Sequence, residues 1–173
     1  GAPQGASVSP LLANVYLHEA LDTWFEREVK PRMRGPSFLI RYADDFVMVF
    51  RHENDARRVL EVLPKRLERF GLTINREKTK LVRFLPSSSR KDRNGPPDDR
   101  PGTFDLLGFT HYWARSRNGY WVVKLKTAKD RFTRAVRSID HWCRDNRHLP
   151  IDQQHKKLNE KLRGHYAYYG VTG

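Results

Sequence analysis

The chain has 173 residues with 33 Lys or Arg and 20 Asp or Glu, which gives a formal net charge of +13 at pH 7. This length suits one domain or one and a half, and so basic a chain is expected to bind nucleic acid or an anionic membrane surface. No apolar run is long enough to span a bilayer, and no signal peptide precedes Gly1. Of the two partners, we expect nucleic acid and not a membrane. The single cysteine, Cys143, cannot form an internal disulfide, which suits a reducing cytosol. We expect a cytoplasmic location of bacterial type, with an organelle as the alternative.

The first nine residues are small and loop-like, and they begin so abruptly that we expect the chain to be a piece of a longer protein. Ser9 followed by Pro10 predicts a helix start, because serine caps a helix and proline fits its first turn. The helix should end near Lys30, since Pro31 cannot continue it. Its predicted apolar stripe consists of Leu11, Leu12, Val15, Tyr16, Ala20, Leu21, Trp24 and Phe25.

Residues 38–50 place two adjacent carboxylates, Asp44 and Asp45, between two apolar runs that alternate as strands do. The pattern predicts a β-hairpin with both acids at or near its tip. The two carboxylates repel each other, and a divalent cation would relieve this repulsion. Mg²⁺ suits such oxygen ligands, because it usually takes one or two carboxylates and leaves the rest to water and phosphates. A solvated acidic turn is the alternative.

Asn54 or Asp55 is predicted to cap a second helix that runs to about Phe70, with Gly71 as its stop. Pro64 should kink or split this helix. A short run, 72–75, then leads to Lys78-Thr79-Lys80 and to a strand over residues 81–85. The predicted buried stripe of the helix is Leu60, Leu63, Leu67 and Phe70.

Residues 86–103 are rich in proline, glycine and charge, which predicts a flexible surface loop. Its Asp98-Asp99 pair lacks strand flanks and receives no catalytic role. Residues 104–113 form a second apolar run, expected as one strand, in which Gly108 indicates a bulge or a close backbone approach. Asn118-Gly119 predicts a two-residue hairpin turn to a strand at 120–125.

Two basic helices are predicted at the end of the chain. Thr127 with Asp130 fits a capping box for a helix to about Asn146, and Asp152 should cap the last helix. From residue 124 to 173 there are 12 basic and 5 acidic side chains, a net charge of +7, so the two parts of the chain should do different work. The basic residues expected to contact nucleic acid are Lys129, Arg131, Arg134, Arg137, Lys156, Lys157, Lys161 and Arg163.

The order of these motifs carries a resemblance. The motifs are Pro3-Gln4-Gly5, the stretch Ser9 to Asn14 with Leu17, Tyr42-Ala43-Asp44-Asp45, Gly71 to Asn75 with Lys78 to Lys80, and Leu107-Gly108-Phe109. This series resembles the reverse transcriptase palm, and specifically the group II intron-encoded reverse transcriptase/maturase family. Residues 162–170 look like that family's thumb, or maturase, segment. The resemblance covers nearly the whole chain outside residues 86–103.

The resemblance implies an α+β fold, with residues 1–125 forming the C-terminal part of the palm and residues 126–173 the start of the helical thumb. It implies an RNA-directed DNA polymerase whose partners are an RNA template or intron RNA, a DNA primer and dNTPs. Viral RNA polymerases commonly have glycine at the position of Ala43 and fit less well. Retron, CRISPR-associated and diversity-generating reverse transcriptases share the Tyr-Ala-Asp-Asp core and remain alternatives.

The family also implies roles for matching residues. Asp44 would bind metal directly and Asp45 less directly. Either Lys78 or Lys80 would lie near the triphosphate, and we favour Lys78.

The resemblance also implies contacts with nucleic acid. Gln4 and Gly5 would line the nucleotide and template pocket. Tyr42 and Ala43 would lie beside the primer terminus and the incoming nucleotide. The primer grip would consist of Leu107, Gly108 and Phe109. The basic helices would follow the template–primer backbone.

Joining a nucleotide to a 3′-hydroxyl group is an in-line displacement at phosphorus, which two metal ions about 4 Å apart can promote. We expect Mg²⁺, with Mn²⁺ as a substitute. In the family another metal-binding Asp comes from a strand upstream of the Pro-Gln-Gly motif, so we expect the 173 residues alone to be inactive. An unprotected sheet edge would also favour self-association. The alternative of another class is a non-catalytic RNA-binding module that assists splicing.

Overall fold

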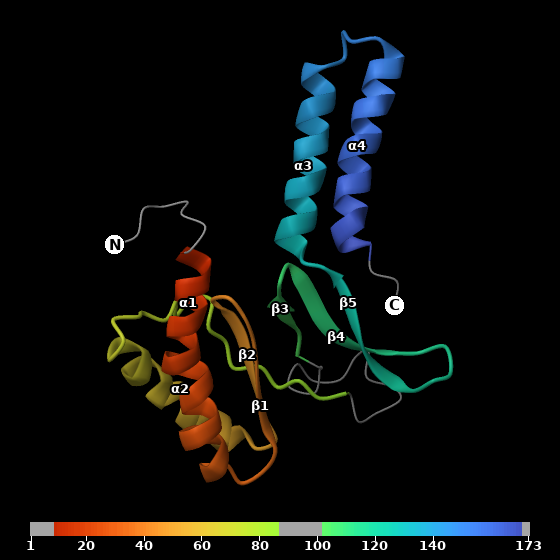
Figure 1. Ribbon diagram of the computed structural model, residues 1–173. Helices are drawn as coiled ribbons and strands as arrows, with labels where there is room; N and C mark the ends of the chain where they lie inside the picture. Colours follow the sequence, from red (N-terminus) through yellow and green to blue (C-terminus); the bar gives the residue numbers. More distant parts are fainter. Residues whose placement is uncertain (1–8, 87–101, 171–173) are drawn as a thin grey trace. The chain divides into compact units, whose positions relative to one another are not determined.

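The computed structural model describes residues 9–86 and 102–170, which form an α+β fold with two antiparallel sheets (Figure 1). The chain divides into two compact units, Gly1–Leu81 and Val82–Gly173. Gln4, Gly5 and most of the predicted loop at 86–103 lie outside the described residues. These units are defined by compactness and need not coincide with the palm and the thumb, so the expected palm–thumb boundary after residue 125 stays a prediction.

The first helical segment is longer and less regular than a plain α-helix. The helix α1 (Ser9–Leu17) continues through two π-helical segments, η1 (His18–Thr23) and η2 (Phe25–Val29), into a 3₁₀ turn, η3 (Lys30–Arg32). The predicted stripe is confirmed from Ala20 onward, where side chains such as those of Leu21 and Phe25 are fully buried. It is wrong for the first turns, because Leu11 and Val15 are exposed and nothing described in this unit covers them.

The predicted hairpin is confirmed. Strands β1 (Ser37–Tyr42) and β2 (Asp45–Phe50) pair antiparallel, and Tyr42 lies opposite Asp45. The connecting loop therefore consists of Ala43 and Asp44 alone. One face of the hairpin packs on the core of the first unit, and the opposite face, which carries Phe38, Ile40 and Tyr42, is exposed.

Helix α2 (Glu53–Glu68) completes the core of the first unit. The core side chains are Leu21, Trp24, Phe25, Val29, Val59, Leu63 and Leu67, with Leu39, Phe46, Met48 and Phe50 packed against them. Pro64 lies inside the helix without splitting it, so the predicted split is wrong, whereas a kink at this residue stays a prediction. Leu63 and Leu67 flank the proline and are both buried, and their packing holds the two halves of the helix against one core.

The two ends of α2 differ in how well they were predicted. Asp55 is not a cap, because His52 precedes the helix and the buried Asp55 carboxylate accepts a hydrogen bond from the backbone N–H of Arg34 at 2.9 Å. Gly71 does end the helix. Its φ is +66°, and its N–H donates to the carbonyl of Glu68 while that of Leu72 donates to Leu67, as glycine-terminated helices commonly do.

Residues 81–86 are not a strand, so the prediction for 81–85 is wrong. Their side chains alternate between exposed and half-buried, as those of a strand would, and the strand prediction rested on this alternation in the sequence. A strand also needs hydrogen bonds to a neighbouring strand. Among the described residues, the backbone of Arg83 has one such bond, which its carbonyl accepts from the N–H of Gly102.

The second unit contains a sheet in the order β3-β4-β5, formed by β3 (Phe104–Leu106), β4 (Phe109–Arg115) and β5 (Trp121–Thr127). The apolar run at 104–113 is therefore two strands and not the single strand predicted. The chain reverses at Leu107 (φ 53°) and Gly108 (φ 79°), a turn that the continuous apolar pattern conceals. The hairpin predicted at Asn118-Gly119 is confirmed, but its loop has the five residues between Arg115 and Trp121 and not the two predicted.

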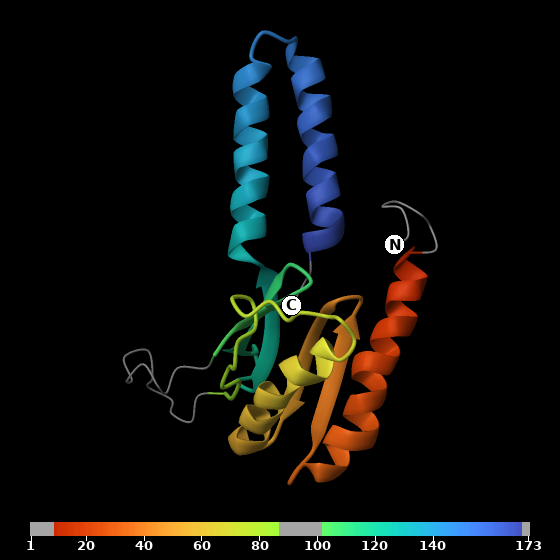
Figure 2. The same cartoon turned by 90° about the vertical axis from the view of Figure 1, so that its left-hand side faces the viewer.

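Helices α3 (Lys129–Asp145) and α4 (Ile151–Tyr169) run side by side in opposite directions (Figures 1 and 2). Neither contains a buried residue. The predicted caps are wrong, because Thr127 ends β5, Ala128 and Pro150 precede the helices, and Asp152 lies in the first turn of α4. No helix within residues 9–86 or 102–170 is long and apolar enough to cross a membrane.

Candidate active site and nucleic-acid interface

Asp44 and Asp45 are both exposed at the tip of the β1–β2 hairpin. Asp45 lies opposite Tyr42, so both side chains occupy the face of the hairpin that is turned away from the core. Within residues 9–86, no ion pair or side-chain hydrogen bond engages either carboxylate. The tip therefore presents two uncompensated carboxylates, which can accept a cation.

The acid pair alone does not make a complete metal centre. Among the described residues, no group of three or more His, Cys, Asp or Glu side chains could hold a metal ion. Two adjacent carboxylates nevertheless fit the part that protein supplies to Mg²⁺, since water and substrate phosphates commonly complete its shell.

Arg41 connects the tip of the hairpin to the first helical segment. Its Nε and Nη2 atoms donate to the two carboxylate oxygens of Asp22, each at 2.7 Å. Its Nη1 atom donates to the side-chain oxygen of Asn14 at 2.9 Å and to the backbone carbonyl of Ala43 at 2.8 Å. The hydrogen bond from Arg41 lowers the pKa of Asp22, and the same bond raises the pKa of Arg41.

Ala43 adopts a left-handed backbone conformation, with φ at 53°. For residues other than glycine this conformation is unfavourable by about 1–2 kcal/mol. Two-residue hairpin loops usually carry Asn-Gly or Asp-Gly, and this loop is Ala-Asp. Residues held in such a conformation persist where surrounding contacts determine them, and the bond from Arg41 is one such contact.

The sequence prediction missed Arg41, Asp22 and Asn14 as members of this site. A signal was present in the strand, where an arginine occupies the core-facing position of an otherwise apolar alternation. A charge at such a position requires a partner. The sequence gives no means of identifying that partner as Asp22.

Lys78 lies on a turn built by Asn75, whose side-chain oxygen accepts the backbone N–H groups of Glu77 and Lys78 at 3.1 and 3.2 Å. The Lys78 side chain is exposed, as is that of Lys80. Within residues 9–86, no ion pair or hydrogen bond joins Lys78 to Asp44. The structure thus does not bring these predicted residues into contact, and their roles stay predictions.

The predicted primer-grip residues form the β3–β4 turn and the start of β4. The hydroxyl group of Tyr168 donates to the carbonyl of Leu107 at 3.1 Å, and its ring stacks on Phe109 with centroids 5.5 Å apart. A Cβ atom at Gly108 would lie 3.0 Å from the Tyr169 hydroxyl oxygen, so the close approach that this glycine indicated is confirmed. The two tyrosines at the end of α4 were not predicted to hold this turn.

The basic side chains predicted to bind nucleic acid lie on α3 and α4. All are exposed except that of Lys161, which is half-buried. Arg131 pairs with Asp130 at 3.6 Å and Lys157 with Glu160 at 2.8 Å. The remaining six form no ion pair with any described residue: Lys129, Arg134, Arg137, Lys156, Lys161 and Arg163.

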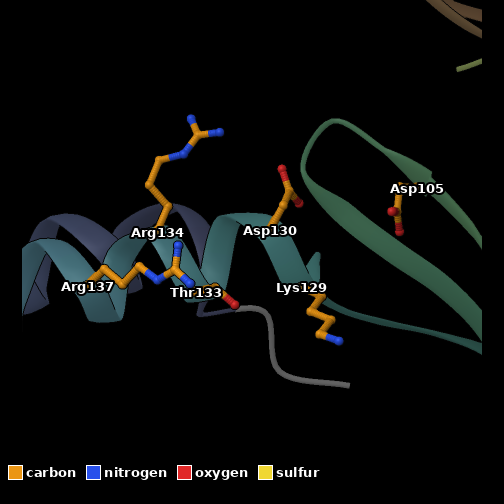
Figure 3. Close-up of a pocket in the computed structure, with 6 residues that line it drawn as sticks. All are labelled: Asp105, Lys129, Asp130, Thr133, Arg134 and Arg137. Carbon is orange, nitrogen blue, oxygen red and sulfur yellow. The ribbon is translucent and has the colours of Figure 1, made fainter. Parts of the chain in front are cut away.

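Three of these basic residues border a hollow of about 640 Å³ at the first turns of α3. In Figure 3 the helix residues of the hollow follow successive turns of α3, and Asp105 lies on the neighbouring strand. The lining residues are Asp105, Lys129, Asp130, Thr133, Arg134 and Arg137. Such a surface can contact a phosphate backbone through its three cations.

Comparison with known proteins decides the family. The sequence profile of the reverse transcriptase (RNA-dependent DNA polymerase) family matches residues 1–111, which include Asp44, Asp45 and the β3–β4 turn. The chain belongs to the reverse transcriptase family. A stretch of 84 residues, 49% of the chain, is 31% identical to telomerase reverse transcriptase of Mus musculus and spans only 7% of that protein. The match confirms the reverse transcriptase resemblance, while the group II intron type stays a prediction.

Proposed function

We propose that the protein is an RNA-directed DNA polymerase of the group II intron type, which adds dNTPs to a DNA primer on an RNA template. One observation carries the proposal. Within the segment that matches the family, a tight hairpin exposes two adjacent carboxylates that have no partner among the described residues. Metal-assisted phosphoryl transfer needs carboxylates of this kind, because they would hold the cations that neutralise the negative charge on the reacting phosphate.

Asp44 would bind Mg²⁺ directly and Asp45 less directly, with Mn²⁺ as a substitute. When bound, Mg²⁺ would lower the pKa of the attacking 3′-hydroxyl group and stabilise the leaving pyrophosphate. The described residues bring together only two of the carboxylates that a two-metal site needs. We therefore also propose that the 173 residues alone do not extend a primer.

The other proposed roles concern binding and orientation. Tyr42 and Ala43 would lie beside the primer terminus, Gln4 and Gly5 would line the nucleotide and template pocket, and Lys78 would contact the triphosphate. Leu107, Gly108 and Phe109 would support the primer through the turn that Tyr168 holds. The eight basic residues of α3 and α4 named above would follow the phosphate backbone of the template–primer or of intron RNA.

We assign residues 1–125 to the palm and residues 126–173 to the start of the thumb. The stretch at 9–17 and the tyrosine-rich segment at 162–170 support the group II type over retron, CRISPR-associated or diversity-generating reverse transcriptases. A cytoplasmic location follows from the single cysteine only as a proposal. Selective extension on group II intron RNA, compared with an unrelated template, would separate these types.

The test is primer extension by the full-length protein with Mg²⁺, an RNA template and a DNA primer. Asp44→Asn should lower the rate at least about 100-fold, because metal-ion stabilisation of the transition state is worth several kcal/mol. Binding of the template–primer should stay unchanged. Asp98→Asn, in the second Asp-Asp pair of the chain, is the matched control and should extend normally. Extension that survives Asp44→Asn would contradict the proposal.

A non-catalytic RNA-binding module that assists splicing is the second candidate. The six cations of α3 and α4 that form no ion pair within the described residues favour it. Steep salt dependence of RNA binding is expected from both candidates, because phosphate contacts release counterions. Intron splicing that persists in Asp44→Asn, with no extension by the wild-type protein under any template, would favour this second function.

A further inference from the structure

We propose that Arg41 is a positioning residue of the polymerase site, which fixes the Ala43-Asp44 turn by tying it to the first helical segment through Asp22 and Asn14. The proposal rests on the proposed function, because it assigns Asp44 a role in catalysis. It adds three residues that act without touching the substrate or the metal.

The hydrogen bonds of Arg41 reach three separate parts of the unit. The guanidinium group forms a two-point contact with Asp22, while Nη1 bridges the side chain of Asn14 and the carbonyl of Ala43. Only 13% of the Arg41 side chain is exposed, compared with 61% for Arg57 in the exposed Arg57–Glu53 pair of α2. A guanidinium group held at both ends of its fork has little freedom to turn, so the Ala43 carbonyl meets a fixed donor.

The irregular helix explains how Asn14 and Asp22 reach the same arginine. In a regular α-helix, residues eight positions apart are rotated by about 80° around the axis. Residues 18–23 are π-helical, and their wider turns rotate the chain less for each residue. Both side chains therefore point to one side of the helix, where Arg41 contacts them. Single π-helical turns are frequent at functional sites.

Arg41 acts on the turn through the backbone and not through charge neutralisation. It lies opposite Phe46 in the ladder, on the face of the hairpin that packs on the core, whereas Tyr42 and Asp45 share the other face. No ion pair within residues 9–86 joins Arg41 to Asp44 or Asp45. The acids thus stay free for a cation, while the left-handed Ala43 that precedes them is held in place.

The test compares primer extension by the full-length protein with three variants. Arg41→Lys keeps the charge but cannot form the fork, and Asp22→Asn removes the charged partner. Both should lower kcat about 10- to 100-fold, since small displacements of a catalytic group have effects of this size. The KM for dNTP and the Kd for template–primer should stay within about twofold. The third variant, Asn14→Ala, removes one exposed contact and should lower kcat less.

Two comparisons separate positioning from general instability. Asn14→Asp restores an acceptor oxygen and should recover the kcat that Asn14→Ala loses. Arg57→Lys, at an exposed pair on α2, is the matched control and should extend normally. Kcat in Arg41→Lys and Asn14→Ala equal to that of Arg57→Lys would overturn the proposal. A fall in kcat that Asn14→Asp does not recover would also overturn it.

The Asp44→Asn arm distinguishes this proposal from the proposed function. If Asp44→Asn abolishes extension and Arg41→Lys does not impair it, the function stands and the positioning role fails. If extension is absent or survives Asp44→Asn, the proposed function fails. Amide hydrogen exchange of the 173-residue chain then decides the role of Arg41 in fixing the turn. Faster exchange around residues 43–45 in Arg41→Lys than in Arg57→Lys supports it, and equal exchange overturns it.

Discussion

The hydroxyl group of Tyr168 donates a hydrogen bond to the backbone carbonyl of Leu107, 61 positions earlier in the chain. Leu107 has a φ of 53°, the same left-handed value as Ala43, whose carbonyl accepts a bond from Arg41. Each unit thus contains a hairpin turn that begins with a left-handed residue other than glycine. In each, a side chain from outside the turn binds that residue's carbonyl, and both turns coincide with predicted site residues.

Removal of the Tyr168 hydroxyl group should loosen the β3–β4 turn while the ring stacking on Phe109 remains. We expect Tyr168→Phe to lower the free energy of unfolding by about 0.5–1.5 kcal/mol, the usual net contribution of a hydrogen bond. Urea denaturation measures this change. Tyr166→Phe is the control, because the Tyr166 hydroxyl group has no hydrogen-bond partner among the described residues. Equal stability of the two variants would contradict the assigned role.

A side chain at Gly108 should disturb the same turn. Gly108→Ala combines a left-handed backbone with a new Cβ atom 3.0 Å from the Tyr169 hydroxyl oxygen. Gly119→Ala has a similar φ, +81°, and open space around its new methyl group. Both should lose about 1–2 kcal/mol of unfolding free energy from backbone strain. Gly108→Ala should lose more, and thermal melts of the two variants compare the difference directly.

The buried carboxylate of Asp55 should be a sensitive position in the first unit. One of its oxygens accepts the Arg34 backbone N–H, and the other has no partner among the described residues. Asp55→Ala should lower the free energy of unfolding by about 1–3 kcal/mol, because a buried donor loses its acceptor. Asp55→Asn keeps an acceptor oxygen and should be milder. Glu61→Ala, on the exposed side of the same helix, should be nearly neutral in chemical denaturation.

The Arg41–Asp22 contact should make stability depend on pH in the acid range. The hydrogen bond from Arg41 lowers the pKa of Asp22 below the ordinary value of 3.8. The folded state therefore holds the Asp22 proton less tightly than the unfolded chain does. The resulting stabilisation is fully present above pH 3.8 and is lost as the pH falls through the lowered pKa. The free energies of unfolding of wild type and Asp22→Asn, measured by urea denaturation, should differ near pH 7 and converge as the pH falls below 3.8.

Salt dependence should reveal which cations contact nucleic acid. Arg134 forms no ion pair with a described residue, whereas Lys157 pairs with Glu160. Arg134→Gln should reduce the slope of log K against log salt concentration by about 0.7–0.9, the loss of one phosphate contact. Lys157→Gln should change the slope less. The binding constants can be measured by fluorescence anisotropy with labelled RNA at salt concentrations from about 50 to 200 mM.

Local patterns in the sequence were sufficient for the hairpin around Asp44 and for the two C-terminal helices, because alternation and helical spacing are properties of neighbouring residues. The same local reasoning failed at residues 81–85, where the alternating pattern pairs with no strand of the part of the chain that the structure describes. It also failed at 104–113, where Leu107 turns the chain inside a continuous apolar run. Propensity alone does not place a left-handed turn at a leucine.

The two acidic residues of the candidate site could be predicted from the sequence, but the side chains that hold its turns could not. Asp44 and Asp45 are adjacent and flanked by strands, so their exposure at a tip follows from the sequence. The bond from Arg41 to Asp22 joins residues 19 positions apart, and the bond from Tyr168 to Leu107 joins residues 61 apart. Such contacts depend on tertiary structure, which neither composition nor periodicity encodes.

The loop between β1 and β2 is Ala-Asp, and a chain with this loop closes a hairpin less readily than one with Asn-Gly. Its closure is coupled to the docking of the first helical segment, which supplies the partners of Arg41. During folding, the two acids should therefore reach their final arrangement late, after the helix has packed on the hairpin. A nascent or partly unfolded chain would carry the same two carboxylates without the turn geometry that the proposed metal binding requires.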